Sequence, residues 1–139
     1  MSHGKQMTAK QLLDGQLKDV TIRVETAIAS QSAMTAIQGQ RFEVMLGYKI
    51  SRAAKAIDEV AKNFGPIQNQ IVQKYGIKSE SKPGQYTYAD GQEAIAKEEM
   101  KAELSKEVIV KVIPLALEDF KGLQLPQEFF EDLDWLITE

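Results

Sequence analysis

The feature that most constrains the fold is a series of apolar residues in the middle of the chain, spaced alternately by four and three positions. This spacing keeps one helix face apolar over about 25 residues, as in a coiled coil or a long helical hairpin. It therefore predicts one long helix that packs against a neighbouring helix. The series consists of Leu46, Ile50, Ala53, Ile57, Val60, Phe64, Ile67 and Ile71.

Glycine and proline give further signals inside and at the end of this helix. Gly65 and Pro66 interrupt the apolar series, and proline lacks an amide hydrogen and clashes with the carbonyl four residues earlier. We therefore expect a kink or a restart at this point. Gly76 is placed to end the helix in the left-handed conformation. The long helix is expected to lie within residues 40–76.

Residues 1–39 are predicted to form an N-terminal helix. Thr8 and Gln11 have the spacing of a capping box, and an apolar stripe with a helical period follows them. A competing interpretation takes Val20–Val24 as a strand, because apolar and β-branched residues alternate there. We favour the helix because its stripe is longer. That stripe consists of Leu13, Leu17, Val20, Val24 and Ile28.

Residues 77–139 carry more varied signals. A polar turn leads to Asp90, which is expected to cap an acidic helix. Val108–Ile113 are mostly β-branched and precede a proline, so they predict a strand that can pair with Tyr86–Tyr88. Pro126 then opens a short C-terminal helix.

Together these elements predict a single, mainly α domain spanning residues 1–139. A chain of this length is within the usual size of one domain and can bury a core of its own. The long kinked helix is expected to form an antiparallel helical hairpin with the N-terminal helix. A small two-stranded β element and the short C-terminal helix complete the predicted fold. No stretch approaches the roughly 20 apolar residues that a membrane-spanning helix needs.

The residue inventory argues against an enzyme. The chain has no cysteine, which excludes disulfides, thiolate nucleophiles and cysteine-ligated metals. Its one histidine is His3, so neither a histidine-based triad nor a histidine-rich metal site is expected. Acidic pairs such as Glu99 and Glu103 share a helix face, and the ordinary interpretation of such a pair is a solvated surface. We therefore predict no catalytic residue, no metal and no cofactor.

Charge is unevenly distributed along the chain. Residues 40–82 contain eight Lys and Arg against four Asp and Glu, whereas residues 83–139 contain five against thirteen. Two such poles can attract a protein partner or a second copy, or they can neutralise one another within the fold. Acidic neighbours and a net charge of −3 make nucleic acid an unexpected partner. The basic residues that we single out as candidate partner contacts are Arg41, Arg52 and Lys55.

The C-terminal segment concentrates large aromatic side chains. Phe129, Phe130 and Trp135 lie beside acidic residues, and aromatic groups ringed by charge are typical of protein interfaces. These three residues are therefore candidate partner contacts. The alternative is that the same helix covers the core of its own domain.

Several short motifs follow one another in a characteristic order from about Phe42 onward. They are the run Tyr48–Arg52 on the long basic helix, the mid-helix Pro66, Lys74–Gly76 before a polar turn, the strand end Val110–Ile113, and the tail Leu123–Pro126. In this order of motifs, the chain resembles a family of small, uncharacterised proteins encoded by tailed bacteriophages and prophages. The resemblance covers about two-thirds of the chain.

The resemblance implies a phage origin, a mostly helical fold and no assigned catalytic residue. On this basis we expect a virion structural or assembly protein that contacts other copies of itself or virion proteins. The alternative is an early phage protein that binds and inhibits a host defence protein or sequesters a host signalling molecule. Either protein would work in the host cytoplasm or in the virion.

Overall fold

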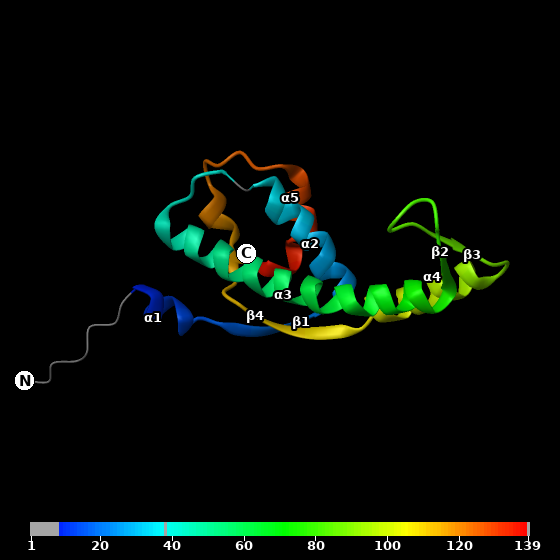
Figure 1. Ribbon diagram of the computed structural model, residues 1–139. Helices are drawn as coiled ribbons and strands as arrows, with labels where there is room; N and C mark the ends of the chain where they lie inside the picture. Colours follow the sequence, from blue (N-terminus) through cyan, green and yellow to red (C-terminus); the bar gives the residue numbers. More distant parts are fainter. Residues whose placement is uncertain (1–8, 38, 139) are drawn as a thin grey trace, which may run out of the picture.

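The predicted long helix forms the axis of the molecule. The computed structural model describes residues 9–37 and 39–138, and helix α3, Val44–Tyr75, runs along most of its length (Figure 1). The predicted apolar series faces inward, because six of its eight members are buried. The fold as a whole is mainly helical, with small two-stranded sheets and a short C-terminal helix, as predicted.

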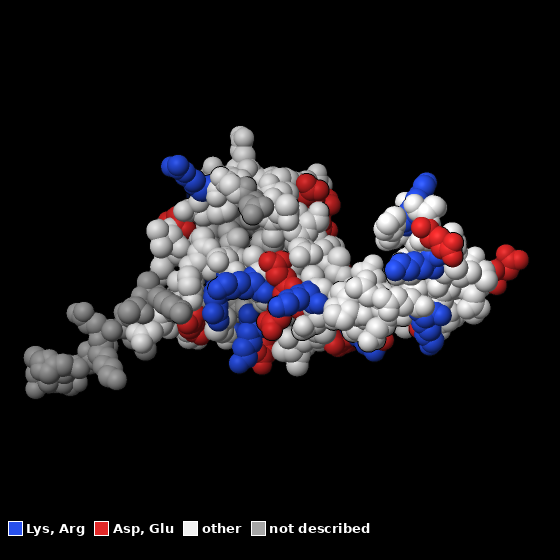
Figure 2. Space-filling view, viewed as in Figure 1, with Lys and Arg blue, Asp and Glu red and all other residues white. Residues whose placement is uncertain are grey.

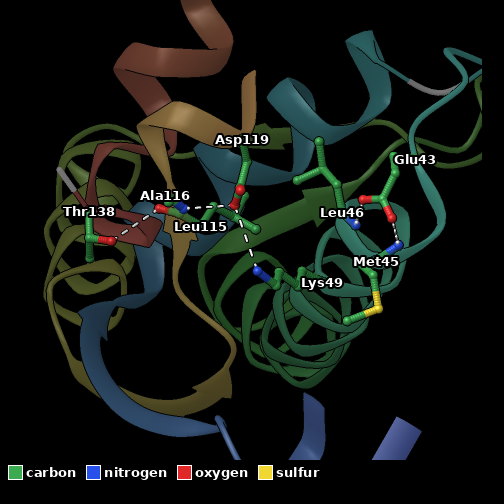
Figure 3. Close-up of polar contacts among 8 residues, drawn as sticks. All are labelled: Glu43, Met45, Leu46, Lys49, Leu115, Ala116, Asp119 and Thr138. Atoms are coloured by element: carbon green, nitrogen blue, oxygen red, sulfur yellow. Dashed lines mark hydrogen bonds and ion pairs between the residues drawn. The ribbon is translucent and has the colours of Figure 1, made fainter. Parts of the chain in front are cut away.

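Helix α3 begins at a side-chain cap. The carboxylate of Glu43 accepts hydrogen bonds from the amides of Met45 and Leu46, at 3.0 and 3.2 Å (Figure 3). These bonds satisfy two of the amides that a helix N-terminus leaves without a partner. The helix then continues through Pro66 as a single element, and the kink expected there stays a prediction.

The end of α3 differs from the prediction. Gly76 is extended rather than left-handed, with φ −90° and ψ 155°, and it is the first residue of strand β2, Gly76–Lys78. Glycine is required there for a different reason. A Cβ atom on Gly76 would lie 2.6 Å from the carbonyl oxygen of Val72 and 3.0 Å from the ring of Tyr86, so close approach of backbone and ring leaves no room for one.

The N-terminal segment is not one helix. It contains helix α1, Ala9–Asp14, strand β1, Lys18–Arg23, and helix α2, Val24–Ala36, which packs on α3. The helix prediction was therefore wrong for β1, where the competing strand interpretation holds. Thr8 of the expected capping box lies outside the described residues, and the antiparallel hairpin stays a prediction.

Both predicted strands exist, but each pairs with a different partner from the one expected. Strand β4, Glu107–Val112, pairs antiparallel with β1, and Val20 lies opposite Val110. Strand β3, Tyr86–Tyr88, pairs antiparallel with β2. The β2–β3 pair is joined by a short turn, and closing a short loop costs less conformational entropy than pairing with the more distant β4.

The rest of the chain is built from short elements. Helix α4, Gln92–Leu104, is the predicted acidic helix, although Gly91, with φ +80°, takes the cap position expected for Asp90. After β4 come β5, η1, α5, η2 and β6, and β5 pairs parallel with β6. Their bounds are Leu115–Ala116, Leu117–Phe120, Gln127–Asp132, Asp134–Leu136 and Ile137–Thr138.

The molecule divides into two regions that share α3. In the first, which we call the body (described residues up to 63, and 105–138), α2, the first part of α3, the β1–β4 ribbon and the C-terminal elements surround the main core. In the second, which we call the arm (residues 64–104), the last part of α3, β2, β3 and α4 extend away from the body (Figure 1). Only three apolar residues of the arm are buried, namely Phe64, Ile71 and Ala96.

Candidate interaction surface

The aromatic residues singled out from the sequence lie in or against the core. Phe129 is fully buried, and its ring meets those of Phe120 and Phe130 edge-on, with ring centroids 5.4 Å from each. Phe130 is partly buried in the same cluster. The side chain of Phe129 is therefore not presented to a partner, and the C-terminal helix covers the core of the body.

Trp135 links the C-terminal segment to α2 through a hydrogen bond. Its indole Nε1 donates to the hydroxyl of Ser30 at 2.9 Å, and Ser30 is fully buried. The Ser30 hydroxyl in turn lies 2.7 Å from the carbonyl oxygen of Thr26 and 3.0 Å from that of Asp132. Because Ser30 and Trp135 are far apart in the sequence, no local pattern could have indicated this contact.

The two charge poles partly neutralise one another inside the chain. Lys49 of α3 lies 3.7 Å from Asp119, whose carboxylate also accepts from the Ala116 amide at 3.1 Å (Figure 3). In the arm, Lys74 lies 3.3 Å from Glu99. On the face drawn in Figure 2, basic and acidic side chains lie next to one another over the middle of the molecule.

Helix α1 is attached to α3 through Asp14. This carboxylate accepts from the Tyr48 hydroxyl at 2.8 Å and lies 3.9 Å from Arg52 Nε. The hydrogen bond to Asp14 raises the pKa of Tyr48, because losing the phenolic proton would leave two anions side by side. Arg52 therefore contributes to the fold, whereas Lys55 is exposed on the same part of α3.

A groove lies between α3 and strand β4. Its volume is about 990 Å³, and both Arg52 and Lys55 line it, whereas Arg41 and the three candidate aromatic residues do not. The predicted contacts are thus only partly brought together. Apolar side chains of α3 and β4 line the groove alongside charged ones, the apolar set being Ala56, Val60, Phe64, Ile67, Val108, Ile109 and Val110.

The groove runs along the free edge of β4. Successive residues of a strand point to opposite faces, yet every residue from Lys106 to Lys111 lines the groove, so the groove meets the strand at its edge. Within the described part of the chain, β1 is the only strand that pairs with β4. The sequence indicated the strand itself, but it gave no signal that one edge would remain unpaired.

Two further features are absent from the described residues. No group of three His, Asp or Glu side chains among them could hold a metal ion. No helix within residues 9–37 and 39–138 is both long enough and apolar enough to cross a membrane. In comparison with known proteins, no protein family, curated protein or solved structure matches the chain.

Proposed function

We propose that this chain is a structural or assembly protein of a tailed phage and acts through protein–protein contacts rather than catalysis. The observation that carries the proposal is the free edge of β4 beside the apolar groove. Unpaired amide and carbonyl groups along a strand edge can pair with a strand from another chain. The apolar side chains in the groove would be removed from water by the same contact.

The edge of β4 lacks two of the devices that keep a strand from pairing with other chains, namely a proline and a β-bulge. It does carry charged side chains, Glu107 and Lys111, which can repel a strand of like charge but attract one of complementary charge. β4 contains no proline, and its register with β1 is continuous from Glu107 to Val112. An edge of this kind suggests that a partner covers it. The assignment to a phage comes from the order of motifs that begins at Tyr48.

The test follows the chain through an infection by the phage, or through induction of the prophage, that encodes it. An affinity tag is placed on the N-terminal side, because β6 at the other end pairs within the body. We expect the tagged chain to sediment with virions or with their assembly intermediates in a constant ratio to known virion proteins. An abundant host enzyme serves as the control and should be absent from these fractions.

A chain missing from particles and intermediates at every stage would contradict the proposal. If the same tag instead recovered one host protein soon after infection, the result would favour the early-inhibitor alternative. Mass spectrometry of the gradient fractions and of the recovered complexes distinguishes the two functions.

A further inference from the structure

We infer that β4 pairs with β4 of a second copy of this chain, antiparallel, with the two Ile109 residues opposite one another. The two ribbons then form one four-stranded sheet in the order β1–β4–β4–β1. This inference rests on the proposed function and deepens it, because it names another copy of the chain as a partner at the free edge.

The first observation is the pattern of side chains on the exposed face of the ribbon. In the β1–β4 register, Arg23 lies opposite Glu107, and Asp19 lies opposite Lys111. Between these two oppositely charged pairs Ile109 is 68% exposed, although it is the apolar centre of the strand. An oppositely charged pair directly across two strands is favourable, whereas the exposed isoleucine has no partner within the ribbon beyond Thr21.

The second observation is that the charges of β4 are complementary to those of a second β4 strand related to it by a two-fold axis at Ile109. In an antiparallel pair centred there, Glu107 of one copy lies opposite Lys111 of the other, and this contact occurs twice by symmetry. If the pair is centred on Val108 or Val110 instead, neither Glu107 nor Lys111 lies opposite a residue of opposite charge. A slip of one residue sets the exposed face of one strand against the buried face of the other.

The combined sheet would then carry charges of alternating sign across all four strands. One row would run Arg23, Glu107, and then Lys111 and Asp19 of the second copy, and the symmetric row would run in the opposite direction. Between these rows the two Ile109 side chains would cover one another. The charge poles, only partly neutralised within one copy, would in this way be matched between copies.

The third observation is the groove, which gives the second strand a place to lie. Val108 and Val110 point toward the core side of the ribbon, so their counterparts in the second copy would point the same way. That direction faces the apolar residues of α3 beside the edge, including Val60 and Ile67. The other strand of the ribbon, β1, is less suited to pair with a second copy. It has a similar charge pattern, but the polar Thr21 is at its centre. The groove, moreover, is lined mostly by α3 and β4.

The test measures the mass of the full chain in solution by light scattering after size-exclusion chromatography. We expect the wild type to form a dimer, where one copy is 15.5 kDa. Ile109→Lys should raise the dimer dissociation constant by about 100-fold or more, because two like charges would face one another in the interface. Thr21→Lys is the matched control, since Thr21 lies on the same face directly opposite Ile109 but away from the new pair.

Both variants change exposed side chains, so their circular dichroism spectra should match that of the wild type. Cysteine variants then test the register, because the chain has no cysteine of its own. Ile109→Cys should form a disulfide-linked dimer under mild oxidation, because opposed residues of paired strands have Cα atoms roughly 4.5–5.5 Å apart. Thr21→Cys should remain monomeric on a denaturing gel.

A wild type that stays monomeric at every concentration would overturn the inference, and so would cross-linking through Thr21→Cys in place of Ile109→Cys. Dimers that Ile109→Lys leaves intact would overturn it as well. None of these results bears on whether the chain sediments with virions. The proposed function and the self-pairing of β4 can therefore fail separately.

Discussion

The body and the arm share one helix but are held together in different ways. In the body, apolar residues from both ends of the chain meet in one core, among them Ile22, Ile57 and Phe129. In the arm, three apolar residues are buried, and none of them belongs to that core cluster. Burial of apolar area supplies most of the stability of a fold, so the arm should be the less stable of the two.

Helix α3 belongs to both regions, but different elements cover its two parts. Its first part is covered by α2, the ribbon and the C-terminal elements, whereas its last part is covered mainly by α4. Regions with few buried apolar contacts can open without global unfolding. We therefore expect the arm to open while the body remains folded, and the following substitutions test this comparison.

The largest effect is expected from Phe129→Ala in the body. Removing a fully buried ring leaves a cavity, and such changes cost about 3–5 kcal/mol. Phe64→Ala in the arm is the matched substitution and should cost less, about 3 kcal/mol or below, because Phe64 borders the groove, where surrounding side chains can relax. Urea unfolding monitored by tryptophan fluorescence and circular dichroism measures both. Equal losses would mean that the two regions unfold as one.

The next effect concerns the junction of α3 and β2. Gly76→Ala should destabilise the arm by about 1–3 kcal/mol, since the added Cβ would lie 2.6 Å from a backbone oxygen and the strand would have to move. Gly47→Ala is the control within the same helix, because the nearest atom to its added Cβ, the Cβ of Phe42, lies at an ordinary contact distance of 3.8 Å. Alanine is the better helix former, so this change should stabilise by about 0.5–1 kcal/mol.

Amide exchange locates the effect of Gly76→Ala. Faster exchange should be confined to β2, β3 and α4, while α2 keeps its protection. Loss of protection in α2 to the same extent would contradict the separation between arm and body.

How far the sequence determines the fold depends on where the decisive contacts lie. The long helix itself was predicted correctly, because its apolar series lies within one continuous segment, whereas its end at Gly76 was predicted wrongly and its kink stays a prediction. At β1 the helix was favoured over the competing strand, because the partner that stabilises this strand, Glu107–Val112, lies near the other end of the chain. In the same way, charge indicated Arg52 and Lys55, but the groove they line depends on which edge of β4 stays free. That property follows from strand pairing and not from local sequence.

A smaller effect is expected from the hydrogen bond between Trp135 and Ser30, which links the C-terminal segment of the body to α2. Trp135→Phe keeps most of the apolar area but removes the indole hydrogen bond to Ser30. Such a bond contributes about 1 kcal/mol, and the Ser30 hydroxyl would keep its backbone acceptors. Thermal unfolding measures the loss by circular dichroism. A loss as large as that of Phe129→Ala would mean that the indole packs more tightly than its partial burial indicates.

The smallest effect is expected from the corresponding polar contact of the arm. Glu99 accepts a hydrogen bond from the Tyr75 hydroxyl and lies 3.3 Å from Lys74 Nζ. The Tyr75 hydrogen bond, followed by the contact with Lys74, holds the pKa of Glu99 below its ordinary value of 4.5. A carboxyl group with a lowered pKa stabilises the folded state above its ordinary pKa, and this contribution is lost as the pH falls through the lowered value.

Acidification below about pH 4.5 should therefore loosen the arm before the body. Protection factors of amides in α4 and α2, followed as the pH is lowered, measure the order of opening. Glu99→Gln should remove this part of the pH dependence from α4, because its neutral side chain cannot titrate. If α2 lost protection at the same pH as α4, or if Glu99→Gln left the α4 profile unchanged, the contact would not be what holds the arm. Helix α4 has a single buried apolar residue, Ala96, so one polar contact is a large part of what holds it in place. In the body, where many apolar residues are buried, a single polar contact would matter far less.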